Sequence, residues 1–208
     1  MQDNPDVMAN QEKQIFLHVG CGRANPERLP NFFRNPKWHE LRLDIDPSVQ
    51  PDIVSSITDM SNVRSDSVHA IWSSHNLEHL HSYDVPLALA EFRRVLRSDG
   101  FVMLTLPDLR AIAKHVLADN LNEVLYHSQV GPIRPLDIIF GHQESLQNGY
   151  HYMAHLTGFT STTLGQVLID AEFAEVRVHE GKRWDLWAIA TMPDTDPTIF
   201  AQLAEVAQ

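Results

Sequence analysis

Short apolar runs of strand length recur through the first half of the chain, and each one ends at Gly, Asp, Ser or Pro. A buried strand that enters a turn gives this pattern. We predict strands over residues 15–19, 38–43, 52–54, 68–72 and 101–106. Between the last two runs, residues 83–96 carry apolar side chains at helical spacing, and Asp99-Gly100 is expected to end that helix. Alternating strands and helices predict an α/β fold, a parallel sheet with helices on its faces.

The second half of the chain begins with a segment of a different kind. Residues 108–158 are rich in turn residues, histidine and tyrosine, so we predict an irregular insertion after the strand at 101–106. A helix capped by Thr160 or Ser161 follows. We thus expect a single domain over residues 1–208, with this insertion as a lid or acceptor-binding segment.

Further elements are predicted on either side of these. Pro26 fits the first turn of a short helix that turns Leu29 and Phe33 inward. Strands at 173–179 and 184–190 flank a Gly-Lys turn, which predicts an antiparallel hairpin, and an amphipathic helix is expected at 199–206.

Composition narrows the class of protein. Acidic residues outnumber basic ones by 27 to 16 and no basic cluster stands out, so nucleic acid is not the expected partner. The lone Cys21 excludes an internal disulfide and suits a reducing compartment. No apolar run reaches the length of a membrane span, and residues 1–14 are too polar for a secretory signal. We expect a cytoplasmic protein that does not engage a membrane; the sequence does not predict its oligomeric state.

The main chemical signal is a strand that ends in Gly20-Cys21-Gly22, followed 24 residues after Gly20 by Asp44 at the end of the next strand. Glycines let the backbone approach a ligand closely, and an acid at that position can accept hydrogen bonds from both ribose hydroxyls. The pair predicts a nucleoside site. Because no third glycine follows and Pro26 stands where a helix would begin, a ligand without a pyrophosphate fits better than a dinucleotide.

Several motifs in order resemble class I (Rossmann-like) S-adenosylmethionine-dependent methyltransferases, of the methyltransferase type 11 kind. The motifs are FLHVGCG at 16–22, LDIDP at 43–47, ITDM at 57–60, SSHNLEHL at 73–80, AEFRRVL at 90–96 and FAEVRV at 173–178. The resemblance implies a seven-stranded, mostly parallel sheet with an antiparallel last strand, and S-adenosylmethionine as cofactor. Asn25 departs from the family, where a glycine is common.

The resemblance also implies roles for individual residues in binding the cofactor. Gly20, Cys21 and Gly22 would approach its methionine end. Asp44 would hold the ribose, and Asp46 would share that task.

Four other residues would bind the remaining parts of the cofactor. Asp59 would face the adenine amine, and Met60 would pack on the ring. Ser74 and His75 would line the space near the sulfonium.

Methyl transfer depends mainly on the alignment of nucleophile, methyl group and sulfur, but an oxygen nucleophile of high pKa also requires a general base. Among twelve histidines we select His75 and His155 as candidates, with His79 and His151 behind them. The spacing of His142, His151 and His155 matches no compact metal site, so we predict no metal.

The acceptor itself is not named by the sequence. Tyr126, Tyr150 and Tyr152 accompany the histidines of the insertion, so this segment is expected to bind the acceptor. Net acidity favours a small molecule or a saccharide. Two alternatives stay open: a nonenzymatic S-adenosylmethionine-binding module, and another nucleoside-cofactor enzyme on the same fold, such as an aminopropyl transferase or a nicotinamide-dependent oxidoreductase.

Overall fold

A computed structural model describes residues 13–128 and 130–204. The helix predicted at 199–206 is observed as α6 (Ile199–Ala204), and its last two residues, like the polar start of the chain, lie outside the described part. Within that part, no helix combines the length and apolarity needed to cross a lipid bilayer.

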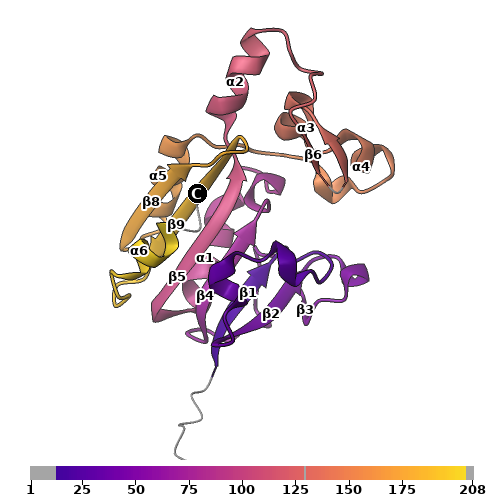
Figure 1. Cartoon of the computed structure of the whole chain (residues 1–208). Helices are drawn as coiled ribbons and strands as arrows, with labels where there is room; N and C mark the ends of the chain where they lie inside the picture. Colours follow the sequence, from indigo (N-terminus) through magenta and orange to yellow (C-terminus); the bar gives the residue numbers. More distant parts are fainter. Residues whose placement is uncertain (1–12, 129, 205–208) are drawn as a thin grey trace, which may run out of the picture.

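The centre of the fold is a seven-stranded mixed sheet with the order β3-β2-β1-β4-β5-β9-β8 (Figure 1). Its strands are β1 (Gln14–Val19), β2 (Trp38–Asp44), β3 (Ile53–Val54), β4 (Val68–Ser74), β5 (Leu96–Pro107), β8 (Glu175–Glu180) and β9 (Asp185–Thr191). The first five strands pair in parallel, and β9 runs antiparallel to both β5 and β8. The predicted α/β class, the strand count and the terminal hairpin are confirmed.

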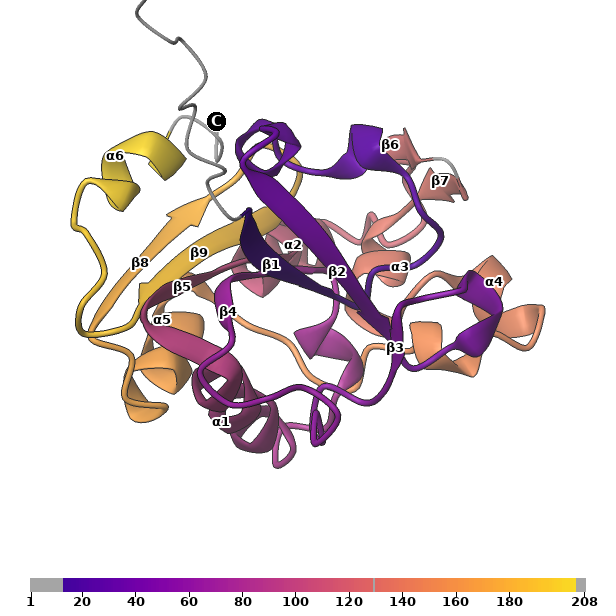
Figure 2. The same ribbon diagram turned by 90° about the horizontal axis from the view of Figure 1, so that it is seen from below.

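One face of the sheet is covered by α1 (Val85–Val95) and α5 (Ser161–Asp170), as Figure 2 shows. In α1 the positions that repeat at helical spacing, including Leu89 and Phe92, are fully buried. Thr160 caps α5. Its side-chain oxygen accepts from the Thr163 N–H, and the Thr160 N–H donates to the side-chain oxygen of Thr163. The predicted cap is therefore confirmed.

The opposite face is covered by short elements. Two 3₁₀ turns, η1 (Pro26–Arg28) and η2 (Asn31–Arg34), and α6 lie on it. Leu29 and Phe33 are buried there, as predicted from the sequence.

The predicted end of the helix before β5 was wrong. The helix before β5 ends at Val95 rather than at Asp99-Gly100, because Leu96 already has extended backbone and pairs with Val68 of β4. Residues 97–100 form an irregularity inside β5, where four residues face one position of β4. Apolar spacing alone could not separate the last helical turn from the first strand residue.

The insertion is also more regular than predicted. It contains α2 (Leu109–Leu117), β6 (Tyr126–Ser128), β7 (Gly131–Ile133), α3 (Pro135–Phe140), α4 (Gln143–Gln147) and the 3₁₀ turn η5 (His151–Met153). Ile112, Ile133 and Ile138 form a small apolar core of its own. In Figure 1 the insertion stands beyond the carboxyl end of β5, above the edge of the sheet where the parallel strands finish.

Candidate active site

A cavity of about 630 Å³ opens at the carboxyl edge of β1, β2 and β4. Its walls come from the turns after these strands and from η5 of the insertion. Of the predicted cofactor-binding residues, the cavity is lined by Gly20, Cys21, Gly22, Asp44, Asp46, Ser74 and His75. The fold therefore brings together side chains from three separate parts of the sequence.

The turn after β1 is held in place by Asp44. The Gly22 N–H donates to Asp44 Oδ2 at 2.8 Å, and the Asp46 N–H donates to Oδ1 at 2.9 Å. Gly20 and Gly22 have φ values of +59° and +57°, a region that side-chain-bearing residues seldom adopt. Each oxygen of Asp44 keeps a further lone pair, so the carboxylate can still accept bonds from a ligand.

Cys21 lies between these glycines and is buried. Burial is the main cause that raises the pKa of its thiol to about 11, with the charge of Arg42 acting in the opposite direction. The thiol is thus neutral at physiological pH. Cys21 therefore forms part of the cavity wall and does not act as a nucleophile.

The turn after β4 has a strained backbone. His75 has φ +49°, and its N–H donates to the Thr105 carbonyl of β5 at 2.8 Å. The next residue, Asn76, packs against Gly20 so closely that a Cβ there would lie 2.8 Å from Asn76 Cγ. Asn76 Nδ2 is buried and has no hydrogen-bond partner among the described residues. It is a donor on the cavity wall that a ligand can satisfy.

Asp46 lines the cavity but its carboxylate serves the local backbone. Its two oxygens accept from the N–H and the hydroxyl of Ser48, each at 2.8 Å, and cap the turn η3 (Pro47–Val49). These hydrogen bonds lower the pKa of Asp46.

Asp59 and Met60 do not reach the cavity wall. Met60 is completely buried in the core under α1, so its side chain has no surface on which a ring could pack. Asp59 is exposed and accepts from the Ser61 N–H. The residues that line the cavity in this part of the chain are Ser55, Ser56 and Ile57.

A buried carboxylate stands behind the turn after β4. Glu78, in η4 (Leu77–His79), has a side chain only 1% exposed, and its Oε1 accepts from His75 Nδ1 at 3.2 Å. Desolvation opposes ionisation of both groups, but their mutual hydrogen bond and charge prevail. The pKa of His75 is therefore above its usual range, and that of Glu78 below it. The His75 side chain is half exposed and faces the cavity.

His79 and His155 lie beside Glu78, with ring centroids 5.0 Å apart. Desolvation lowers the pKa of His155, so its ring is neutral at physiological pH. Two of the four histidines considered as bases, His75 and His155, thus meet different environments: one faces the cavity, and the other lies behind its wall.

The insertion reaches the cavity through η5. Tyr150 and Tyr152, which are 62% and 69% exposed, line it together with His151 and Met153. Tyr126 does not, because it stacks on Trp184 with ring centroids 6.0 Å apart. His142 is buried and caps α4 by accepting from the Ser145 N–H, so it does not belong to this wall.

Sequence reasoning missed part of the cavity. His18, Glu40 and Trp72 of β4 all line it. His18 Nδ1 lies 2.7 Å from Glu40 Oε1, within hydrogen-bond distance. Arg42 lines it as well and donates to the carbonyls of Gly22, Val49 and Gln50. Strand alternation was the available signal, since every second residue before Asp44 shares its face.

Residues 17–104 match the family of methyltransferase domains. No curated protein matches the sequence at a significant level.

Solved structures share the fold. The CMeT domain of the citrinin polyketide synthase matches with a TM-score of 0.57 and 19% identity, over 90% of this chain and 48% of that one. An S-adenosylmethionine-dependent methyltransferase from Archaeoglobus fulgidus gives 0.56 and 13%, over 86% of each chain. The 1,6-didemethyltoxoflavin N1-methyltransferase of Burkholderia thailandensis gives 0.55 and 14%, over 89% of this chain and 72% of that one. At these identities the likeness shows the fold.

Proposed function

Because this chain carries the methyltransferase domain of the class I S-adenosylmethionine-dependent enzymes, we propose that it methylates a small hydroxylated acceptor, a small molecule or a saccharide, at the cavity described above. The observation that carries the proposal is that the Gly20–Gly22 turn, Asp44 and η5 of the insertion face one cavity. Its volume of about 630 Å³ suits small-molecule ligands.

The residues of the cavity fit S-adenosylmethionine. Asp44 accepts the ribose hydroxyls, and Asp46 shapes the turn beside it instead of sharing the ribose. The Gly20–Gly22 turn, with Cys21 between, lies along the methionine portion, and Ser74 and Asn76 complete that end. The unpaired Asn76 Nδ2 supports this placement, because it supplies a donor to the polar tail of the cofactor.

For the adenine ring we propose Ser55, Ser56 and Ile57 as neighbours. They take the place of Asp59 and Met60, because they line the cavity and the latter two do not. Ile57 presents an apolar side chain and the two serines present hydroxyls, which suits a flat heterocycle with a polar edge.

We assign proton acceptance to His75. Its Nδ1–H donates to Glu78, so Nε2 carries the lone pair in the neutral ring, and His75 lines the cavity. Bound S-adenosylmethionine supplies a methyl group on a sulfonium, which is a good leaving group. The chain has to align the acceptor oxygen with that methyl and to hold the released proton at His75 Nε2. His155 is not assigned this role, because it lies behind the wall.

The acceptor is expected to rest against η5. Tyr150 and Tyr152 offer apolar faces with a hydroxyl at the tip, a surface suited to a small ring-bearing acceptor or a sugar. The Burkholderia thailandensis methyltransferase with the same fold has 1,6-didemethyltoxoflavin bound in its structure, which supports a small acceptor here. The insertion, residues 108–158, thus acts as the acceptor-binding segment of a single methyltransferase domain.

The test is an assay for release of S-adenosylhomocysteine over a panel of small hydroxylated compounds and saccharides, with tRNA and a protein extract as contrasts. We expect turnover with a member of the small-molecule panel. Tyr152→Ala should raise the KM for that acceptor and leave the affinity for S-adenosylmethionine unchanged.

Tyr126→Ala is the matched control, because Tyr126 stacks on Trp184 away from the cavity and its loss should leave KM unchanged. Turnover confined to tRNA or protein, or equal effects of the two tyrosine changes, would contradict the proposal.

A further inference from the structure

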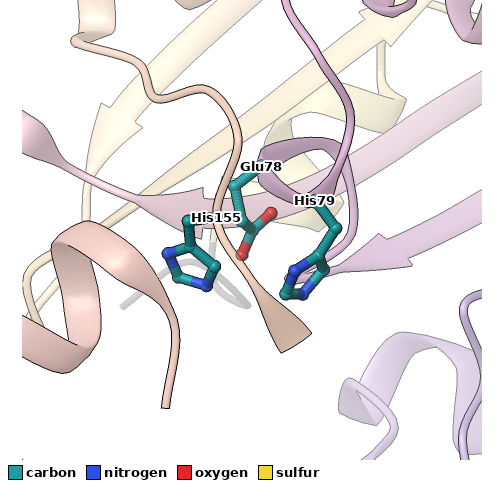
Figure 3. Close-up of side chains that lie close together, drawn as sticks. All are labelled: Glu78, His79 and His155. Atoms are coloured by element: carbon teal, nitrogen blue, oxygen red, sulfur yellow. The ribbon is translucent and has the colours of Figure 1, made fainter. Parts of the chain in front are cut away.

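Three side chains with metal-ligand chemistry converge behind the cavity wall. Glu78, His79 and His155 place one ligand atom each within 4.8 Å of one another. Figure 3 shows the carboxylate between the two imidazole rings, with His79 from the turn after β4 and His155 from the insertion. Sequence spacing gave no sign of this group, because His155 lies 76 positions after His79 in the chain.

We propose that Glu78, His79 and His155 form a binding site for a divalent transition-metal ion, with Zn²⁺ as the reference ion. Two imidazoles and one carboxylate are a ligand set found in mononuclear sites that keep a position open for water or substrate. This set differs from His142, His151 and His155, on which the sequence-based expectation of no metal rested.

The hydrogen bonds of His79 and His155 use Nδ1 of each ring and leave Nε2 free to bind a metal ion. His79 Nδ1 donates to the Ala154 carbonyl at 3.0 Å, and His155 Nδ1 donates to the Ile138 carbonyl at 2.8 Å. Donation from Nδ1 fixes the neutral tautomer whose Nε2 carries a lone pair. Metal-bound histidines are characteristically held by such backbone carbonyls.

Glu78 supplies the independent observation. Its side chain is 99% removed from solvent, yet Oε2 has no hydrogen-bond partner among the described residues. A buried carboxylate oxygen left without a partner is costly. Since Oε1 is already bound by His75, Oε2 is the free atom, and the carboxylate that carries it lies between the two rings. A cation at this point would satisfy it.

The geometry requires the side chains to move closer together on binding. Bonds from zinc to nitrogen or oxygen are about 2.0–2.2 Å, so two ligand atoms of one tetrahedral ion lie about 3.3–3.6 Å apart. The three ligand atoms lie within 4.8 Å of one another, so the largest approach needed is about 1.5 Å. Of the three residues only His79 lines the cavity, so the ion would sit in the wall between cavity and insertion.

The ion would join the insertion to the methyltransferase core. The backbone already makes this junction, because the N–H groups of Leu156 and Thr157 donate to the Glu78 carbonyl at 2.8 and 3.2 Å. A ligand from each side adds a bond across the same junction. Binding should therefore stabilise the protein and hold η5 over the cavity.

The experiment uses the full, untagged chain after dialysis against a chelator, titrated with Zn²⁺ in a calorimeter. We expect one ion per chain with a Kd of about 1 µM or tighter, and a higher unfolding temperature on addition of Zn²⁺. His155→Ala and His79→Ala should each weaken binding by about 100-fold or more, since loss of even an outer partner costs 10–100-fold.

His151→Ala is the matched control, because His151 lies in the same insertion, is exposed, and belongs to no group of metal-ligand side chains among the described residues. It should leave the affinity unchanged. Glu78→Gln provides a second variant of nearly identical shape, and the Co²⁺ absorption spectrum reports ligation directly. No binding tighter than about 100 µM, or equal losses in the His151 and His155 variants, would overturn the site. Neither readout depends on methyl transfer, so failure here is distinguishable from failure of the proposed function.

Discussion

Gly22 donates its backbone N–H to Asp44 Oδ2 at 2.8 Å, so the turn after β1 is fastened to the end of β2. The same carboxylate accepts from the Asp46 N–H through Oδ1. One side chain therefore sets the shape of two adjacent turns at the carboxyl edge of the sheet. The proposed cofactor site depends on this arrangement.

Gly20→Ala is expected to destabilise the protein more than Gly22→Ala. Both glycines have positive φ, which costs about 1–2 kcal/mol for a residue with a Cβ. Only the Cβ at position 20 would also collide with Asn76, whereas nothing lies within 4 Å at position 22. Equilibrium urea denaturation of the two variants measures the difference, and equal losses would contradict the packing of Asn76 on Gly20.

The thiol of Cys21 is expected to react slowly with iodoacetamide. With a pKa of about 11 against 9.0 for an unperturbed thiol, its thiolate fraction at pH 8 is about 100-fold smaller. The rate should keep rising with pH up to about 11 in the folded protein. The urea-unfolded chain is the control, and a folded-state rate equal to it at pH 8 would show that the thiol is not buried.

Glu91→Gln is expected to cost about 2 kcal/mol at pH 7, because Glu91 accepts charged hydrogen bonds from Arg94 and a backbone bond from Met60. The Arg94 hydrogen bond is the main cause that lowers the pKa of Glu91. A carboxylate with a lowered folded-state pKa stabilises the protein above its unfolded pKa, here about 4.5, and loses this effect as the pH falls through the folded value.

The stability difference between wild type and Glu91→Gln should therefore shrink as the pH falls from 7 towards 3. Thermal unfolding at several pH values measures it. Glu175→Gln is the control, since its pair with Arg177 is solvent-exposed and should contribute at most about 0.5 kcal/mol. A difference that stays constant with pH would contradict the role of the Glu91 charge.

Phe92→Ala is expected to destabilise the protein by about 3–5 kcal/mol, because the ring is fully buried between α1 and the sheet. Leu117→Ala, at a side chain 87% exposed, should change stability by less than about 0.5 kcal/mol. Urea denaturation compares the two, and similar losses would show that α1 does not cover this face.

The sheet could be predicted from the sequence because each strand is a compact apolar run with its own turn residues. Asp44 and the glycine turn were equally accessible, since both lie at strand ends where parallel strands share an edge. The antiparallel hairpin of β8 and β9 followed from the resemblance and the Gly-Lys turn.

The site behind the cavity wall could not be predicted, because it depends on contacts between distant segments. His155 meets Glu78 only because the insertion folds back over the turn after β4, and no local pattern encodes that path. The position of Met60 was missed for a related reason. An apolar residue after a short strand can face a ligand or the core, and only packing against α1 decides between them.

The affinity of S-adenosylmethionine, measured by calorimetry for wild type, Asp44→Asn and Asp59→Asn, tests the central claim most directly. NAD serves as the contrasting ligand. We predict that wild type and Asp59→Asn bind S-adenosylmethionine alike and bind no NAD. Asp44→Asn, still folded by circular dichroism, should bind at least about 10-fold more weakly, as expected for loss of hydrogen bonds to a charged group. Unchanged affinity in a folded Asp44→Asn protein, or a larger loss in Asp59→Asn, would contradict the account.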